Sequence, residues 1–223
     1  DKNHIEQVKD VSNIIHIDSS NGDISFIINA LKQTQTNRMS AIVSVQNIFY
    51  NCSGWFCEFK NNSESLTQWR ALRDQINSEK LSSTIFSFYI DEPEMYARIR
   101  EAKAAEHGIQ LKVDIIAELE SISRIIKSDY PNSKLQMTSA ANDVHSKMIL
   151  PRGFDIFGMN CYTGWTSCGP SHNKKSIPEF YEILTNKINE LENTDGRPRY
   201  LSLFPPSFYT DDESSTEYPT KRI

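Results

Sequence analysis

The sequence predicts an α/β fold, a (β/α)8 barrel of the TIM type that is incomplete or truncated. Short runs rich in Ile, Val and Phe alternate with stretches of helical periodicity, which indicates parallel strands with helices packed outside them. No G-x-G-x-x-G or P-loop sequence follows any strand, which disfavours a doubly wound nucleotide-binding sheet. Six or seven strands can be recognised, whereas a closed barrel of this type has eight.

The first part of the chain is predicted to contain two strands and two helices. Residues 13–18 form a strand with a polar end, and residues 41–50 form a second strand rich in β-branched and aromatic residues. The intervening helix follows a turn at residues 21–23, and the second helix covers residues 65–76, with Trp69 in the core. The apolar sides of the two helices comprise Ile24, Ile27, Ile28 and Leu31 in the first and Leu66, Trp69, Leu72 and Ile76 in the second.

Residues 84–90 are predicted as the third strand, and residues 94–130 as two helices separated at His107-Gly108. A short strand at residues 109–113 is the alternative for the start of the second helix. The remaining elements are strands at residues 134–141, 154–162 and 199–208 and a helix at residues 177–191. We therefore expect one barrel-like domain over residues 1–209, followed by a polar tail at residues 210–223.

Composition narrows the choice of partners. A chain of 223 residues with 38% hydrophobic residues can bury one large core. No apolar run approaches the ~20 residues that a membrane-spanning helix requires. The net charge of −5 is spread over the chain without a basic stripe, which argues against a nucleic-acid partner and fits a neutral or weakly polar ligand.

The four cysteines form two close pairs, Cys52/Cys57 and Cys161/Cys168, and each pair encloses a Gly-Trp dipeptide. Two local disulfides are the first interpretation, and they predict a secreted or periplasmic protein. A zinc cluster and reduced thiols are the alternatives, although neither spacing is of the C-x2-C type. We expect the disulfide loops to present Trp55 and Trp165 as walls of a cleft.

The strand ends supply a set of polar and aromatic residues. In a parallel barrel all the carboxyl ends of the strands lie on one face, which carries the active site. Carboxylates, amides and flat aromatic rings together suit a sugar. The predicted catalytic residues are Glu92, Asp91 and Asp18, and the predicted binding residues are His16, Gln46, Tyr50, Trp55, Asn160, Tyr162 and Trp165, with Asn142, Asp143 and His145 at a further strand end.

The tetrapeptide Asp91-Glu92-Pro93-Glu94 lies where a strand gives way to a helix. A proline suits the first turn of a helix, and an Asp suits the position that caps it. Capping accounts for Asp91 and leaves Glu92 for chemistry. The alternative is that Glu92 is an N-terminal carboxylate favoured by the helix dipole.

Two segments resemble a known superfamily. Residues 86–93 (FSFYIDEP) resemble the fourth-strand signature of TIM-barrel glycoside hydrolases, and residues 154–162 (FDIFGMNCY) resemble a later strand of the same proteins. The resemblance implies a carbohydrate substrate, no cofactor, Glu92 as general acid/base, Asp91 as the polar residue before it, and Asn160 and Tyr162 facing the sugar. A second Glu is expected near the end of a late strand, but residues 203–209 contain no carboxylate, so Asp18 or Asp143 is left for that role.

Two other functions remain open. The missing late Glu favours a non-catalytic carbohydrate-binding barrel with a degenerate site. A metal-dependent hydrolase built on His16, Asp18 and Glu92 is the third hypothesis, because these residue types bind cations. No H-x-H or H-x-x-x-H pair supports it, and we expect no bound metal.

Overall fold

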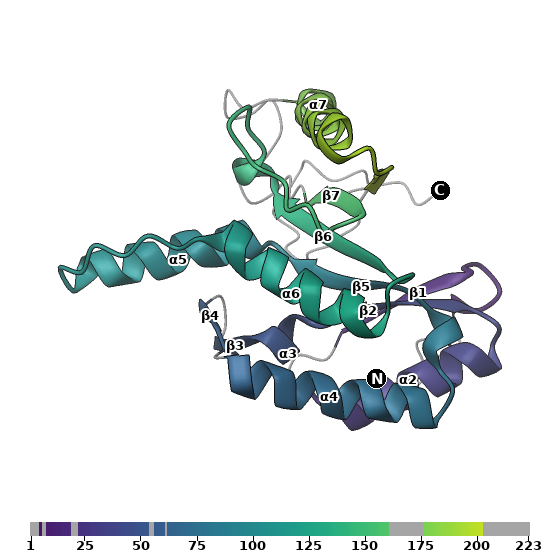
Figure 1. Ribbon diagram of the computed structural model, residues 1–223. Coiled ribbons are helices and arrows are strands. Elements are labelled where there is room, and N and C mark those ends of the chain that lie inside the picture. The colour runs from purple at the N-terminus through teal and green to yellow at the C-terminus, as the bar shows by residue number, and fades with distance from the viewer. Residues whose placement is uncertain are drawn as a thin grey trace, which may run out of the picture.

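The computed structural model describes residues 5, 8–18, 22–53, 56–60, 62–160 and 176–202. The predicted strand end at residues 203–208 and the predicted tail at residues 210–223 lie outside this set. Six parallel strands form one sheet in the order β1-β2-β5-β6-β7-β8 (Figure 1). The strands are β1 (Ile14–Ile17), β2 (Ser40–Ser44), β5 (Ile85–Asp91), β6 (Lys134–Ala140), β7 (Ile156–Asn160) and β8 (Tyr200–Ser202).

The order of these strands decides between the two kinds of parallel α/β fold. Each strand of the sheet pairs with the one that follows it along the chain, as in a barrel, whereas a doubly wound sheet reverses its order part-way. Among the described residues β1 pairs only with β2, and β8 only with β7, so the barrel is not closed. The prediction of an incomplete (β/α) barrel is therefore confirmed.

Helices connect the strands. They are α2 (Ile24–Thr36), α4 (Asn62–Ser78), α5 (Pro93–Glu106), α6 (Ile115–Asp129) and α7 (Ile177–Asp195). The predicted break between α5 and α6 is present, with Gly108 in the left-handed conformation at φ 71°. The alternative strand at residues 109–113 does not form. Between β6 and β7 there is only the short 3-10 turn η2 (Ala141–Asp143) and a loop.

Aromatic rings fill the space between the sheet and the helices. Trp69 of α4 is almost fully buried and contacts the rings of Phe49, Phe88 and Tyr130. Its indole N–H donates to Oδ2 of Asp129 at 2.7 Å. This confirms the prediction that Trp69 belongs to the core.

The other face of the sheet carries polar side chains. Parallel register places Ser44, Tyr89 and Gln136 side by side, and Asp91 beside Thr138. Ser87 on the same face donates to Oε1 of Gln136 at 3.1 Å. Because alternate residues of a strand point to opposite faces, this polar face leads directly to the strand ends that carry Asp91.

The predicted second strand, residues 41–50, is wrong in its second half. The strand β2 ends at Ser44, and the chain continues as the one-turn helix α3 (Gln46–Phe49) and a hairpin of β3 (Tyr50–Ser53) and β4 (Phe56–Phe59). A short apolar run does not distinguish a strand from a buried helical turn by periodicity. Here Ile48, Phe49 and Tyr50 are all buried, but from a turn and a hairpin.

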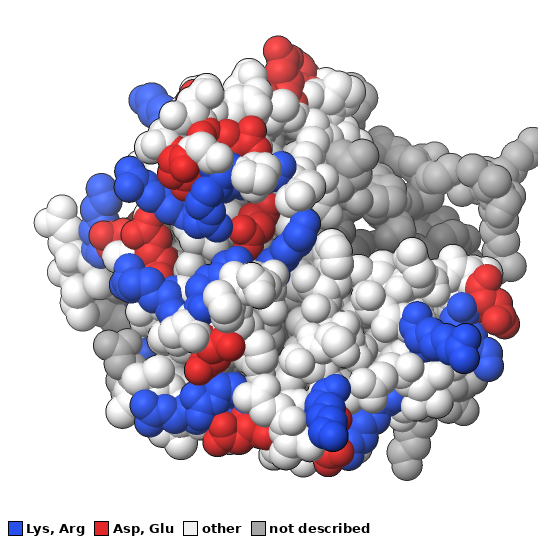
Figure 2. Space-filling view, turned by 45° about the vertical axis from the view of Figure 1, so that its right-hand side comes forward, with Lys and Arg blue, Asp and Glu red and all other residues white. Residues whose placement is uncertain are grey.

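The surface mixes both signs of charge. On the face shown in Figure 2, Lys and Arg side chains are interspersed with Asp and Glu side chains. Within the described ranges, no helix combines the length and the apolar character that crossing a membrane would require.

Candidate active site

Asp91 lies at the centre of a hydrogen-bonded network of four residues at the carboxyl ends of β5, β6 and β7. Oδ1 of Asp91 accepts from the hydroxyls of Tyr89 at 2.7 Å and Thr138 at 2.5 Å, and from Nδ2 of Asn160 at 3.0 Å. The Tyr89 and Thr138 hydroxyls are also 2.6 Å apart. Three donors on one oxygen hold the Asp91 carboxylate in a fixed orientation.

Asp91 does not cap the following helix. It is the last residue of β5, and its side chain is used by the network described above. The N-cap residue of α5 is Glu92, which makes no side-chain capping bond and has left-handed backbone angles of φ 38° and ψ 48°. A non-glycine residue in this conformation costs about 1–2 kcal/mol, and such strain concentrates at functional sites. The capping interpretation of Asp91 is therefore wrong, and the Glu92 side chain makes no capping bond to α5.

The Glu92 carboxyl is buried and its pKa is raised. Glu92 is 3% exposed, and its Oε1 has no hydrogen-bond partner among the described residues. Burial, and then the neighbouring Asp91 carboxylate, raise the pKa of Glu92 to about 7, although a hydrogen bond with Asn160 opposes the shift. Asp143 also raises this pKa, and Arg98 lowers it. Such a group is partly protonated near neutral pH.

A second buried carboxyl belongs to Glu94, two residues after Glu92 in the first turn of α5. Oε1 of Glu94 accepts from the Ser139 hydroxyl at 3.0 Å, while its Oε2 is buried without a partner among the described residues. Burial is the main cause that raises the pKa of Glu94 to about 7, and Asp143 adds to it. Asp143 itself is held by Arg98 through two bonds, at 2.7 and 2.9 Å.

Glu94 should make the protein less stable as pH rises. Its pKa is raised from 4.5 to about 7, so the unfolded chain loses this proton first, and the folded state is penalised between these two values and fully above the higher one. Glu94→Gln removes this titration. The free energy of unfolding of the variant, relative to that of wild type, should therefore rise by about 3 kcal/mol between pH 4.5 and pH 8. Urea unfolding of both proteins at several pH values measures this gain.

The matched control for that experiment is Glu106→Gln, at the exposed end of the same helix. The free energy of unfolding of this variant should differ from that of wild type by nearly the same amount at each pH. If the difference in free energy of unfolding between Glu94→Gln and wild type is equally independent of pH, the interpretation of Glu94 as a buried carboxyl with a raised pKa is contradicted.

His16 lies beside the network on β1. Its ring meets the Tyr89 ring edge-on with 4.8 Å between centroids. Desolvation lowers the pKa of His16, while the charges of Asp18 and Asp91 raise it. His16 and Asp18, which directly follows β1, are both exposed.

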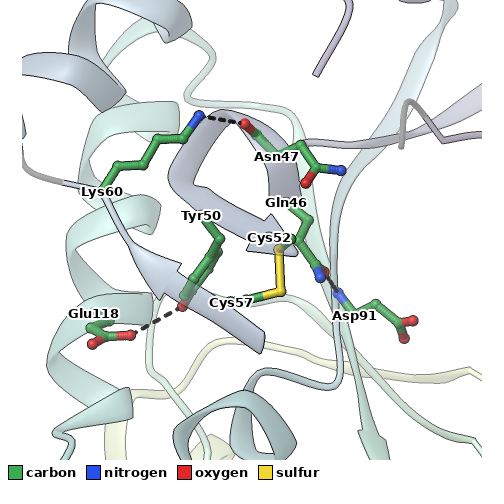
Figure 3. Close-up of a disulfide and its surroundings, with 8 residues drawn as sticks. All are labelled: Gln46, Asn47, Tyr50, Cys52, Cys57, Lys60, Asp91 and Glu118. Atoms are coloured by element: carbon green, nitrogen blue, oxygen red, sulfur yellow. Dashed lines mark hydrogen bonds between the residues drawn. A yellow bond between two sulfur atoms is a disulfide. The ribbon is translucent and has the colours of Figure 1, made fainter. Parts of the chain in front are cut away.

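The hairpin next to the site contains the predicted Cys52–Cys57 disulfide, which is present (Figure 3). The structure separates Tyr50 from the cluster, because its side chain is fully buried and its hydroxyl donates to Oε2 of Glu118. Oε1 of Gln46 accepts from the backbone N–H of Asp91 at 2.8 Å, so this side chain supports the site. The predicted residues Trp55, Cys161, Tyr162, Trp165 and Cys168 lie outside the described residues.

Sequence reasoning missed several residues of the cluster. Tyr89 and Thr138 lie within strands, yet Tyr89 is two residues before Asp91, and that spacing places it on the same face. Glu94, Ser139 and Arg98 gave no comparable signal. Among the described residues no group of three His, Cys, Asp or Glu is placed to hold a metal ion. A groove of about 510 Å³ between α6 and α7 includes none of the residues of this cluster in its lining.

Comparison with known proteins gives no match to any protein-family model or curated sequence. Among solved structures, a β-glucuronidase of Bacteroides uniformis has a TM-score of 0.50 and 15% identity, over 88% of this chain and 20% of that one. The β-mannanase of the blue mussel Mytilus edulis has a TM-score of 0.47 and 12% identity, over 89% of this chain and 77% of the mannanase. A fungal β-1,4-galactanase has a TM-score of 0.46 and 13% identity, over 88% of this chain and 67% of the galactanase.

The β-glucuronidase match and the strand order point to the same architecture. The fold is an incomplete TIM-type (β/α) barrel. The chain spans about a fifth of the length of the β-glucuronidase. In a TIM barrel the catalytic residues lie at the carboxyl ends of the strands, where Asp91, Glu92 and Asn160 are found. The strand that carries Asp91 is the third described strand of the sheet, whereas the resembling signature belongs to a fourth strand.

Proposed function

We propose that the chain acts as a glycoside hydrolase on an oligo- or polysaccharide, with Glu92 as its general acid/base. One observation carries the proposal. Glu92 is a buried carboxyl at a barrel strand end, it is held in a strained backbone, and it takes no part in helix capping. Its pKa near 7 lets it donate a proton to a leaving oxygen and take one back at neutral pH.

The neighbouring groups would divide the remaining work. The Asp91 carboxylate next to Glu92 favours the protonated form of Glu92. Asn160 contacts both Asp91 and Glu92 and could offer its amide to a sugar hydroxyl. Asp18 is the candidate for the second carboxylate, because Asp143 is already bound by Arg98. A separation near 5–5.5 Å between Glu92 and its partner predicts retention, and ~6.5–9.5 Å predicts inversion.

The remaining predicted binding residues belong to the same proposal. His16 would contact the sugar from β1, and Tyr162, Trp55 and Trp165 would contribute aromatic faces. The Cys52–Cys57 disulfide supports export, since disulfides persist in oxidising compartments.

A panel of soluble polysaccharides tests the proposal. Purified protein is incubated with β-mannan, β-1,4-galactan, β-glucan and xylan, and new reducing ends are measured over time. We expect release from at least one substrate, with an optimum on the acidic side of about pH 7. Absence of release from the whole panel and from aryl glycosides would contradict catalysis.

The second candidate is a carbohydrate-binding barrel without activity. The observation that favours it is the Arg98–Asp143 ion pair, which removes one of the two carboxylates that could have completed the site. Calorimetric binding of an oligosaccharide without release of reducing ends would select this function over the first.

A further inference from the structure

Residues 46–53 and 56–60 form a compact excursion between β2 and α4, and its organisation indicates a role beyond packing. The excursion contains α3 and the β3–β4 hairpin, which the Cys52–Cys57 disulfide closes (Figure 3). It leaves the sheet immediately before Gln46, so the first side chain of the excursion is the one that reaches Asp91.

Lys60, the last residue of the excursion, clamps both ends of α3. Its backbone N–H donates to the carbonyl of Phe49 at 2.9 Å. Its ammonium donates to the carbonyl of Asn47 at 2.8 Å and to Oε1 of Gln68 at 2.6 Å. The Lys60 side chain is only 7% exposed. A buried ammonium is costly unless it is fully paired, and an apolar side chain of similar length would fill this space at lower cost.

The turn α3 depends on this support. A single helical turn is unstable on its own, and the N-cap residue Val45 offers no side-chain bond. On the other side, the turn at Gly22 packs closely: a Cβ there would lie 3.1 Å from the Asn47 carbonyl oxygen. The Asn47 carbonyl is thus held between Lys60 and the β1–α2 turn.

The side chain of Gln46 replaces a missing strand partner. The last backbone bond from this side of the sheet runs from the Val45 N–H to the Tyr89 carbonyl at 3.0 Å, and the chain then turns into α3. The next amide of β5 on that side, the N–H of Asp91, would lack an acceptor without Gln46. From the other side, the N–H of Glu92 donates to the Thr138 carbonyl at 2.9 Å.

We infer that Lys60 is a positioning residue for Glu92, because it fixes α3 so that Gln46 holds the Asp91 amide and, with it, the left-handed backbone of Glu92. The residue before a proline favours an extended backbone, so a released Glu92 would relax and turn its carboxyl out of the buried site. The catalytic meaning of this arrangement rests on the proposed function. The arrangement itself does not.

The test follows the titration of the Glu92 carboxyl by NMR in protein labelled with ¹³C-Glu, assigned by comparison with Glu92→Gln. In wild type it should titrate near 7, and in Lys60→Met its pKa should fall toward 4.5. The sign is informative, because loss of a cation alone would raise the pKa of a carboxyl. Asp91, Asp143 and Arg98, which act on Glu92 electrostatically, are unchanged in this variant.

Two further variants give the comparison. Lys60→Arg keeps a cationic donor and should retain a pKa nearer to that of wild type. Glu118→Gln weakens the contacts that α6 makes with Tyr50 of the hairpin and with Arg100 of α5, and it should leave the Glu92 titration unchanged. If Lys60→Met does not fold, Gln46→Leu removes the same acceptor directly and should lower the Glu92 pKa in the same way.

A folded Lys60→Met or Gln46→Leu protein in which Glu92 titrates as in wild type would overturn the inference. The measurement needs no substrate, so it separates the inference from the proposed function. A lowered Glu92 pKa in a protein that releases no sugar supports the positioning role and contradicts catalysis. If the wild type is active but the Glu92 titration does not move in these variants, the proposed function is supported and the positioning role of Lys60 is contradicted.

Discussion

Replacing Glu92 with Gln should reduce turnover of the best substrate by about 10²–10⁴-fold, the range associated with loss of a general acid. Gln has nearly the same shape as Glu but cannot donate a proton to the leaving oxygen. The variant should therefore keep its fold, its circular dichroism spectrum and its calorimetric affinity for an oligosaccharide. Initial rates at saturating and limiting substrate measure the loss.

The pH profile provides a second readout of the same residue. Glu92 must carry its proton to act as an acid, so wild-type activity should decline as pH rises through about 7. Glu106→Gln, at the other end of α5, is the matched control and should keep both the rate and the profile. Full activity of Glu92→Gln would remove Glu92 from the mechanism.

Replacing Trp69 with Ala should lower the free energy of unfolding by about 3–5 kcal/mol, the usual cost of deleting a buried aromatic side chain. Trp69 is 1% exposed and joins α4 to Phe88 of the sheet and to Tyr130 at the end of α6. The substitution also leaves Asp129 without the indole N–H. Urea unfolding followed by circular dichroism measures the change.

Trp69→Phe separates the two contributions. It keeps an aromatic ring in the cluster and loses only the hydrogen bond and part of the volume, so a smaller cost of about 1–2 kcal/mol is expected. A Trp69→Ala protein destabilised by less than that would show that the ring cluster is not central to the core.

The alternation of strands and helices was readable from the chain because each element has its own periodicity and clear stop signals, such as His107-Gly108. The α3 turn was not readable, because residues 41–50 are continuously rich in strand-forming residues. The end of β2 is set by tertiary contacts. The Gln46 side chain replaces a backbone acceptor for the amide of Asp91, and Lys60, at the far end of the hairpin, donates to the Asn47 carbonyl of the turn.

The candidate site divides in a similar way. His16, Asp91, Glu92 and Asn160 could be grouped in advance because they end parallel strands, and the structure brings them together around one network. The role of Gln46 could not be foreseen, since no pattern in the chain shows which backbone amide lacks an acceptor. Glu94 lies in the first turn of α5, and only the surrounding fold reveals its buried oxygen.

The strand order has a consequence for how the chain folds. Every strand of the main sheet pairs with the preceding one, from β1 through to β8. A chain that emerges from the ribosome from its N-terminus can therefore add each new strand to an edge that already exists, without waiting for a later segment. Until the next strand arrives, that growing edge exposes unpaired amides and carbonyls, which leaves it open to pairing with the wrong partner.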